Sequence, residues 1–576
     1  MSGGEFLLKG TEPSDIFTPE DLTPEHRAIV ATTDKFWRND IAPRLAEIQR
    51  QEPGVLVSVL KKSAELGLLG VMVPEKFGGM EMDLVSMMLV AEGVGRDGSY
   101  AASHGAHAGI GTLPLLLFGT EEQKAKYLPK LASGEWIGAY CLTEPQAGSD
   151  ALAAKTRADL TEDGSHYVLN GQKMWITNGG IADLYTVFAK VGGEHFTAFL
   201  VERSWAGVRP GAEEHKMGIK GSSTTAVFLD GARVPKENVL GEIGRGHIIA
   251  FNILNVGRLK LGSGVLGGMR STLGEAIRYA RERKAFGKPI SDFGLIQQKL
   301  GEMAIRTYAT EAVTYRVIGM IGEMLSGLSW EQPDAAKSML KAFEEFAAEC
   351  SVVKVFASEA LNFVVDEAVQ IHGGYGYHHD YAVETAYRDS RINRIFEGTN
   401  EINRLLITGM LLKRAQRGKL GLVEAVRGLQ SEVLAPSSGT DLRDEDLQLV
   451  TNSKKIVLLL LAAAYQKFLD KIEEQQEVIA GIADAVTESF AMESVLLRAR
   501  KSGTEAALLA ADVFVRDSMM RTETVARNVL AACAEGDGLR TQFAILRRYT
   551  KFTAVNSFES RRQIARRLVE AGRYIV

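Results

Sequence analysis

The segment Arg394–Glu401 (RIFEGTNE) places one carboxylate, Glu397, in a short apolar context directly before Gly398 and just ahead of a predicted helix start. Two interpretations follow. The carboxylate could interact favourably with the N-terminal dipole of the next helix. It could also be a partly desolvated general base, whose pKa burial would raise toward neutral. The segment alone leaves both open.

Two segments have the composition of a loop and a strand end that meet a flat polar ligand. Tyr140–Asp150 (YCLTEPQAGSD) is rich in small and polar residues, and Trp175–Thr177 (WIT) ends a predicted strand with an indole and a hydroxyl. Such a loop can bring backbone amides and hydroxyls close to a ligand. The simpler alternative is a turn followed by an ordinary sheet aromatic.

Two further segments suit phosphate or nucleotide binding. Arg281–Lys288 (RERKAFGK) resembles the basic end of a helix, which pairing with the macrodipole would explain, but Arg283 could also clamp a phosphate. Gln370–Tyr377 (QIHGGYGY) has three glycines in four residues. Either a tight turn or close backbone approach to a nucleotide would require them.

The chain changes character three times, which indicates four regions. Helical spacing in Glu25–Ile48, Gly54–Leu68 and Leu84–Val94, with Thr120 as an N-cap, predicts an N-terminal helical domain over 1–138. Short β-branched runs predict a compact antiparallel β domain over 139–245, with turns at Asn170-Gly171 and Asp230-Gly231.

Long periodic stretches then predict a helical bundle over 246–416. These stretches are His247–Lys284, Asp292–Leu325, Pro333–Ile371 and Asn400–Leu412. A looser stretch over 417–445, which contains Pro436-Ser-Ser-Gly439, is predicted to be a linker, and 446–576 a further helical domain. The predicted fold class is therefore mainly α with a central antiparallel β domain, plus an additional C-terminal helical domain.

Composition narrows the function classes. Lys and Arg number 67 against 72 Asp and Glu, and this near-balance argues against a dedicated nucleic-acid binder. Cys141, Cys350 and Cys533 are too few and too far apart for a disulfide framework or a four-ligand zinc site, so no metal is expected. A reducing compartment fits best.

No membrane or targeting segment is expected. Tyr100–Thr120 is interrupted by His, Pro and Gly, and the apolar run Ile456–Tyr465 is too short to span a bilayer. The N-terminus (MSGGEFLLKGTEPSD) has no signal- or transit-peptide pattern. A cytoplasmic location is expected, with contact at the inner membrane left open, or a mitochondrial one if a transit peptide has been removed.

Five segments, in this order and with this α–β–α layout, resemble the acyl-CoA dehydrogenase family. They are YCLTEPQAGSD, WITNGG, ERKAFG, QIHGGYGY and RIFEGTNEI, and the resemblance covers roughly residues 20–415. It implies an N-terminal helical domain, a central β domain, a four-helix bundle and an FAD cofactor. It also implies that an acyl-CoA is the substrate and electron-transfer flavoprotein the acceptor.

The resemblance assigns FAD contacts by position. Segments around the flavin ring and ribityl chain match Tyr140, Leu142, Thr143, Gly148, Ser149, Trp175, Ile176 and Thr177. The FAD site shared with a neighbouring subunit matches Arg283, Phe293, Gln297, Gln370, Gly373 and Gly374, and Phe286 matches a further FAD contact. Thr399 and Glu401 match the adenine side. A site shared between subunits implies at least a homodimer.

The same resemblance assigns the substrate side. Glu397 matches the base that removes the proton next to the thioester carbonyl, and the substrate contacts match Ser149, Asn255, Arg258 and Gly398. Some relatives carry the base where this chain has Gly257, which cannot serve. Two departures are Ala285, in place of a frequent polar residue, and Phe396, in place of a frequent tyrosine.

The segment matching one wall of the acyl pocket, Ala101–Leu117, is unusually rich in small residues: Ala102, Ala106, Gly109 and Gly111. They would leave a deep apolar pocket, although close helix packing is an alternative. Together with the extension past residue 415, this favours the very-long-chain branch and a long-chain acyl-CoA. An acyl-CoA oxidase using O₂ and an assembly protein that retains the fold remain alternatives.

The extension is rich in basic residues: Arg498, Arg500, Lys501, Arg547, Arg548, Arg561, Arg562, Arg566 and Arg567. A basic amphipathic helix could lie on an anionic membrane surface. A solvated helix face or a subunit interface is the alternative.

Overall fold

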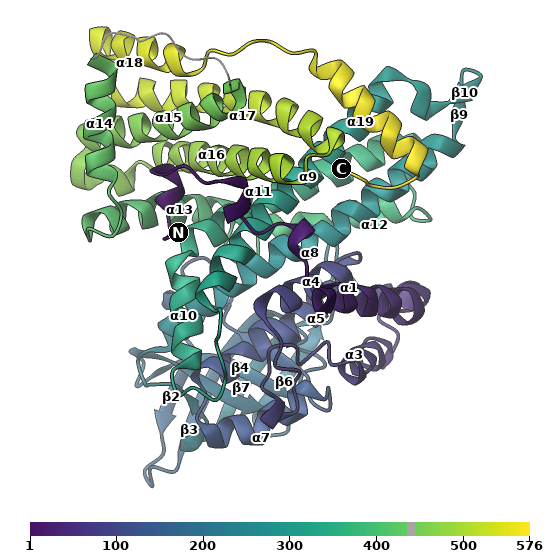
Figure 1. Ribbon diagram of the computed structural model, residues 1–576. Helices are drawn as coiled ribbons and strands as arrows, with labels where there is room; N and C mark the ends of the chain where they lie inside the picture. The colour runs from purple at the N-terminus through teal and green to yellow at the C-terminus, as the bar shows by residue number, and fades with distance from the viewer. Residues whose placement is uncertain (435–443) are drawn as a thin grey trace.

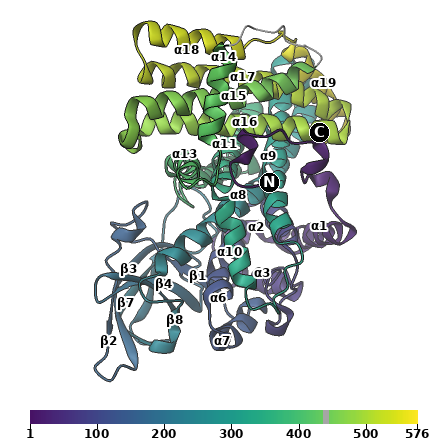
Figure 2. The same ribbon diagram turned by 60° about the vertical axis from the view of Figure 1, so that its left-hand side comes forward.

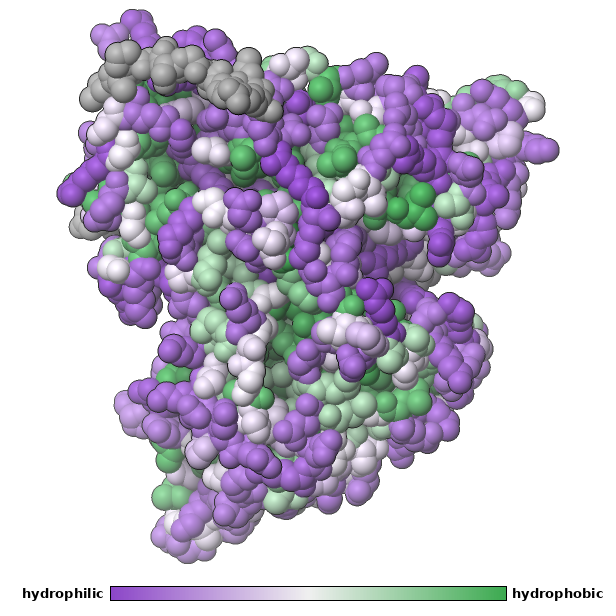
Figure 3. All heavy atoms as spheres, viewed as in Figure 1, coloured by the Kyte–Doolittle hydropathy of each residue, from purple (hydrophilic) through white to green (hydrophobic). Residues whose placement is uncertain are grey.

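A computed structural model describes residues 1–434 and 444–576 of the chain. Three layers follow one another (Figures 1 and 2): the N-terminal helices and the sheet lie at one end, the long bundle helices in the middle, and the C-terminal helices at the other end. The N-terminal segment runs along the C-terminal helices before it enters the first layer. The face drawn in Figure 3 is mostly hydrophilic, with apolar residues gathered around the waist.

The first layer is a set of short helices. They are α1 (Pro24–Phe36), α2 (Leu45–Gln49), α3 (Val55–Glu65), α4 (Leu84–Val94), α5 (Gly98–Gly105), α6 (Leu113–Phe118) and α7 (Glu121–Ala132). The predicted helix Glu25–Ile48 is broken after Phe36 by a π turn and then a 3-10 turn at Pro43, because proline lacks the N–H that continues a helix. The predicted N-cap Thr120 is confirmed, since its hydroxyl accepts the Gln123 N–H.

The sheet contains eight strands in the order β6-β7-β3-β2-β4-β5-β8, with β1 beside β4. Their bounds are β1 (Gly138–Cys141), β2 (Arg157–Leu160), β3 (His166–Thr177), β4 (Leu184–Val191), β5 (His195–Glu202), β6 (Val208–Glu213), β7 (Thr224–Pro235) and β8 (Val239–Leu240). Most pairs are antiparallel as predicted, but β4 runs parallel to both β1 and β2. The sheet is therefore mixed.

Both predicted hairpin turns are wrong. Asn170-Gly171 lies inside β3 and Asp230-Gly231 inside β7, where the register shifts and the Asn170 side chain accepts the Gly231 N–H at 2.8 Å. The glycine is needed for another reason: a Cβ at Gly171 would come within 2.5 Å of the Thr156 hydroxyl. Pairing between distant strands has turned a local turn signal into a bulge.

The middle layer is the helical bundle. Its long helices are α8 (Gly246–Glu282), α9 (Gly294–Met324), α11 (Ala347–His372) and α13 (Asn400–Gln416), joined by α10 (Ala335–Glu345), α12 (Ala382–Ser390) and the small hairpin β9 (Lys284–Ala285) and β10 (Lys288–Pro289). The predicted helix Pro333–Ile371 is two helices, separated at the buried Phe346. The N-terminal Gly3 and Gly4 donate to Glu345 and Glu349 at this break.

The C-terminal layer begins earlier than predicted. Residues Leu422–Leu434, placed in a linker by the sequence, form helix α14, and the proline-containing part of that linker lies within 435–443, outside the described residues. The layer continues with α15 (Glu445–Phe468), α16 (Gln476–Ser502), α17 (Glu505–Cys533), α18 (Gly536–Tyr549) and α19 (Ser557–Ala571). An amphipathic pattern of Leu, Val and Ala in α14 was masked by the neighbouring turn residues.

Among the described residues, α15 is the one helix long and apolar enough to cross a membrane by length and composition. Two-thirds of its apolar window, 67%, is buried inside the protein, where the helix packs against α16 and α17. Its apolar character is that of a core helix in this fold.

Several of the basic residues considered for membrane contact are internal. Arg498 and Arg561 are 3% and 6% exposed, and both are held in ion pairs with carboxylates of other elements. Arg500 and Lys501 pair with Asp444 and Asp21. These four side chains therefore join parts of the chain and do not form a membrane surface. The amphipathic pattern could not reveal partners far away in the sequence.

Helices α4 and α8 cross with backbone against backbone. A Cβ at Gly267 of α8 would lie 2.1 Å from the Glu92 carbonyl oxygen, and one at Gly95 would lie 1.9 Å from the Gly264 carbonyl oxygen. Only glycine permits this approach. The crossing fixes α8 against the first layer.

We expect Gly267→Ala to destabilise the protein by about 1–3 kcal/mol, because the added methyl forces the two helices apart. The matched control is Gly274→Ala in the same helix, where an added Cβ meets nothing within 4 Å in the described part of the chain. The control should gain up to about 1 kcal/mol from helix propensity. Apparent melting temperatures of the two variants check the expectation, and equal shifts would contradict it.

Candidate active site

A largely apolar groove with a cavity of about 200 Å³ runs along one face of α8. Its α8 lining recurs at helical spacing and consists of Ile253, Val256, Gly257, Lys260, Leu261, Gly264, Val265, Gly268 and Thr272. The opposite wall comes from α4, α5 and the π turn that follows α5, and it contains the predicted small residues Ala102, Ala106 and Gly109. Gly111 is buried against the Gly138 backbone instead, so its role is close packing.

Glu397 reaches this groove at Gly257. The ideal Cβ position of Gly257 lies 2.6 Å from Glu397 Oε2, so α8 must lack a side chain where the carboxylate rests. A base on α8 and a base at 397 therefore exclude each other sterically. Glu397 Oε2 is buried and has no hydrogen-bond partner among the described residues. The carboxylate is therefore packed against Gly257, while its Oε2 has no hydrogen bond among the described residues.

The backbone around Glu397 is strained and held from two sides. Glu397 itself has φ 59°, a left-handed value that costs roughly 1–2 kcal/mol outside glycine, and Gly398 follows with φ 79°. Arg258 donates from Nε to the Glu397 carbonyl at 3.2 Å, and Asn403 donates to the Gly398 carbonyl at 2.8 Å. Thr399 caps α13, because its hydroxyl accepts the Ile402 N–H.

Three cations surround the Glu397 carboxylate without a direct ion pair in the described structure. Burial raises the pKa of Glu397 to about 7, while Arg258, Lys354 and Lys260 oppose that rise. Burial lowers the pKa of Lys260 to about 8 and that of Lys354 to about 7, and the Glu397 charge opposes both shifts. The Tyr140 hydroxyl is close enough to interact with the same carboxylate: burial and the negative charge of Glu397 both raise the pKa of Tyr140. Glu397 therefore titrates close to neutral pH.

The end of β3 also reaches the groove. Thr177 lines it, and Trp175, two residues earlier, is 58% exposed with φ 56°. The Tyr140 hydroxyl is buried without a hydrogen-bond partner in the described part of the chain. The predicted loop is anchored below this point by a buried ion pair of 2.7 Å between Lys173 and Glu144.

The other residues of that loop divide between core and surface. Leu142 packs against the core, Ile176 is buried, and the Thr143 carbonyl accepts the Met174 N–H at 2.9 Å. Gly148 and Ser149 lie exposed at the outer end of the loop. Their contacts with a ligand stay predictions.

The second predicted group lies on an exposed surface at one end of the bundle. Phe286 is 95% exposed and its ring centroid lies 6.0 Å from that of Phe293, while the Arg283 guanidinium lies 5.5 Å from the Tyr375 ring. Gln370, Gly373 and Gly374 are exposed beside Tyr375, and Gln297 is half-buried with its amide bound to the Ser291 carbonyl. Glu401 is exposed in the first turn of α13. These residues do not meet Glu397.

Two residues predicted to contact substrate, Asn255 and Arg258, are linked to the segment that carries Glu397. Arg258 donates to the Asn255 side chain at 2.8 Å as well as to the Glu397 carbonyl, and neither residue lines the groove. They position the base, and direct contact of either with substrate stays a prediction. The sequence analysis did not identify Lys260 and Lys354, which act on the Glu397 carboxylate. Lys260 lies three residues after Gly257 on the same helical face, a spacing that could have revealed it.

Comparison with known proteins agrees with this site. Residues 23–135, 139–232 and 244–412 match the N-terminal, middle and C-terminal domains described for acyl-CoA dehydrogenases, and 452–548 match a further acyl-CoA dehydrogenase C-terminal domain. The chain belongs to the acyl-CoA dehydrogenase family. It is therefore an oxidoreductase of an FAD-dependent family, as the resemblance predicts.

Individual relatives support the same conclusion. A probable acyl-CoA dehydrogenase of Bacillus subtilis is 47% identical over 100% of this chain and 99% of its own length. The human mitochondrial very long-chain specific acyl-CoA dehydrogenase is 38% identical over 77% of this chain and 69% of its own. An acyl-CoA dehydrogenase complexed with FAD from Bacillus anthracis superposes with a TM-score of 0.98 at 47% identity, covering 100% of both chains.

The residues present fit FAD. Trp175 at the end of β3 offers an exposed indole on a strained backbone, and Tyr140 in β1 offers a buried hydroxyl with no partner among the described residues; both are groups that would hold an aromatic isoalloxazine ring with polar edges. At Gly373 and Gly374 an added Cβ would meet nothing within 4 Å in the described structure, so the backbone there is open to close approach. Within residues 1–434 and 444–576, no group of three or more His, Cys, Asp or Glu is placed to hold a metal.

We expect kcat/KM to rise with pH through a pKa near 7, because Glu397 accepts a proton only when ionised. Lys260→Met removes a cation that favours the ionised form, so the acid limb of the profile should move to higher pH. Activity below the limb should fall by up to about tenfold, while the alkaline plateau is retained. Lys260→Arg is the matched control. A Lys260→Met limb at the wild-type position would contradict the assignment.

Proposed function

We propose that the protein oxidises long-chain acyl-CoA thioesters to trans-2-enoyl-CoA, the first step of fatty acid β-oxidation, and passes the electrons to an electron-transfer flavoprotein. The observation that carries the proposal is the Glu397 carboxylate, whose Oε2 has no hydrogen-bond partner among the described residues and which rests on Gly257 in a long, largely apolar groove. Similarity to very long-chain specific relatives and the matching C-terminal domain add support.

The length of the groove supports a long acyl chain. From Gly257 to Thr272 the lining follows α8 for 15 residues, which is about 22 Å at 1.5 Å per residue. A carbon–carbon bond is about 1.5 Å long, so an extended chain needs at least about 15 bonds to span that length. Glycine and alanine on the facing wall leave the space open.

The chemistry follows from the position of the base. A thioester in the groove lies beside the Glu397 carboxylate and beside Thr177 at the end of β3, since both residues line the groove. Glu397 removes the proton from the carbon next to the carbonyl. Its backbone N–H, which has no acceptor among the described residues, is free to donate to the carbonyl oxygen as negative charge develops there. When bound, FAD supplies the acceptor for the hydride of the next carbon.

The exposed surface around Arg283, Phe286 and Tyr375 is where a second subunit would cover the outer part of FAD. Its aromatic residues are typical of an interface core, and the Arg283 guanidinium is typical of a phosphate contact. A homodimer is therefore part of the proposed enzyme.

Glu397→Gln tests the assignment of the base. The amide keeps the shape of the side chain but cannot accept the proton, so turnover should fall by roughly 10²–10⁴-fold. The flavin absorbance spectrum of the purified variant should match that of the wild type, which serves as the control for cofactor binding. Wild-type turnover in the variant would refute the role of Glu397.

Anaerobic titration with acyl-CoAs of increasing length tests the substrate class and the acceptor. Flavin bleaching should be complete with hexadecanoyl-CoA, and the reduced enzyme should reoxidise rapidly with electron-transfer flavoprotein but slowly in air. Bleaching restricted to short thioesters would contradict the long-chain proposal. Fast reoxidation in air would instead indicate an oxidase.

A further inference from the structure

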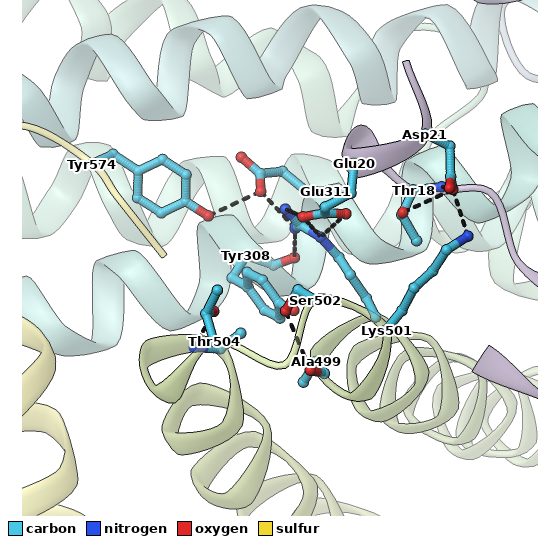
Figure 4. Close-up of polar contacts among 12 residues, drawn as sticks. Thr18, Glu20, Asp21, Tyr308, Glu311, Ala499, Lys501, Ser502, Thr504 and Tyr574 are labelled. Carbon is cyan, nitrogen blue, oxygen red and sulfur yellow. Dashed lines mark hydrogen bonds and ion pairs between the residues drawn. The ribbon is translucent and has the colours of Figure 1, made fainter. Parts of the chain in front are cut away.

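A line of paired charged side chains leads from the C-terminal layer to the wall of the groove; it is buried at Arg498 and Glu311, while the Arg270 side chain is 34% exposed. It starts at Arg498 of α16, which donates to Glu311 of α9 at 2.7 Å and to Glu20 of the N-terminal segment at 2.9 Å. The Arg498 guanidinium also lies 4.1 Å from the centre of the Tyr308 ring. Figure 4 shows Glu20, Glu311 and Tyr574 converging on this point from three separate parts of the chain.

Glu311 connects Arg498 to the helices of the bundle. Its Oε2 accepts from Arg498 and, at 2.9 Å, from the Tyr574 hydroxyl near the C-terminus, while its Oε1 accepts from Arg270 of α8 at 2.7 Å. The Glu311 and Arg498 side chains are 1% and 4% exposed. A carboxylate buried this deeply needs both of its cations, because loss of either leaves it incompletely compensated.

Arg270 connects Glu311 to the first layer. It also pairs with Glu92 of α4, whose second oxygen accepts the Tyr315 hydroxyl at 2.9 Å. Four helices are thereby linked in sequence: α16, α9, α8 and α4. Glu92 is next to Ala91 and close to Val94 and Gly95, which line the groove.

This chain of ion pairs reaches the groove at its distal part, which is the region around Gly264 and Gly268, far from Glu397. Gly95, the residue after the last turn of α4, lies against Gly264 of α8, and its carbonyl oxygen is 3.3 Å from the ideal Cβ position of Gly268. Gly264 and Gly268 are 7 and 11 residues past Gly257, or about 10 and 16 Å along the helix. A short acyl chain held at Glu397 ends before this region, whereas a long one passes through it.

We propose that Arg498 is a positioning residue for the distal acyl groove, so that the additional C-terminal domain determines long-chain specificity through the line Arg498–Glu311–Arg270–Glu92. The inference rests on the proposed function, because it takes the groove as the acyl site. The domain acts on substrate length without touching substrate.

The test uses the full-length, FAD-loaded enzyme and two substrates, hexadecanoyl-CoA and butanoyl-CoA. Arg498→Met should lower kcat/KM for hexadecanoyl-CoA by about tenfold or more, since a misplacement of about 1 Å caused by a remote mutation can cost roughly 10²-fold in rate. It should leave kcat/KM for butanoyl-CoA within about twofold of the wild type. Arg498→Lys should recover part of the long-chain activity.

The matched control is Arg516→Met. Arg516 is also buried in the C-terminal layer and pairs with Glu445, Asp446 and Asp512, all within α15 and α17. It should change stability without changing the ratio of the two kcat/KM values. If Arg498→Met fails to fold, Tyr574→Phe removes one hydrogen bond to Glu311 and should shift the same ratio to a smaller degree.

Equal losses for both substrates, or the same ratio change in Arg516→Met, would overturn the inference while leaving the proposed function standing. A wild-type enzyme that turns over butanoyl-CoA but not hexadecanoyl-CoA would overturn both. Wild-type turnover of both substrates with a selective long-chain loss in Arg498→Met would establish the positioning role.

Discussion

The contact between the Glu397 carboxylate and the bare backbone of Gly257 determines how the rest of the site is built. A methyl group at position 257 would occupy the space of the carboxylate, so helix α8 can approach the base only where it carries glycine. The left-handed backbone at Glu397 and Gly398 then directs the side chain toward α8, and Arg258 and Asn403 hold that conformation through carbonyl oxygens. The strain is local and is offset by contacts from two helices.

The charges around Glu397 affect its protonation without occupying its oxygens. A buried carboxylate in direct contact with a cation would be ionised but already engaged, and an isolated one would be protonated. Here Arg258, Lys260 and Lys354 act from beyond ion-pair distance in the described structure. The pKa of Glu397 therefore stays near 7, and its carboxylate oxygens stay available to accept a proton from a substrate C–H. Lys260 and Lys354 have lowered pKa values because burial costs them as well.

Helix α8 connects the two ends of the molecule. One face forms the groove, the glycine crossing fixes it to α4, and Arg270 ties it to Glu92 and to Glu311. The C-terminal layer meets the same helices through Arg498, with the N-terminal segment held between them by Glu20. The additional domain and the catalytic layers therefore pack as one unit at this point. Through these ion pairs the extension helps to position the part of α8 that lines the groove far from Glu397.

The sequence by itself determined features that depend on near neighbours along the chain. The Thr120 cap, helix Leu84–Val94, the long bundle helices and the apolar setting of Glu397 all follow from residues a few positions apart. The five motif segments were sufficient to indicate the family and its cofactor. Their order along the chain also predicted the sequence of helical and strand layers.

The tertiary structure decided what depends on distant partners. Asn170-Gly171 is a bulge because β7 pairs across it, and residues 422–434 are a helix despite the turn signals beside them. Arg498 is an internal ion-pair residue because Glu20, 478 positions away, and Glu311 enclose it. The charge of a residue can be read from a sequence, but burial and pairing set its energy, and both depend on which remote segments pack against it.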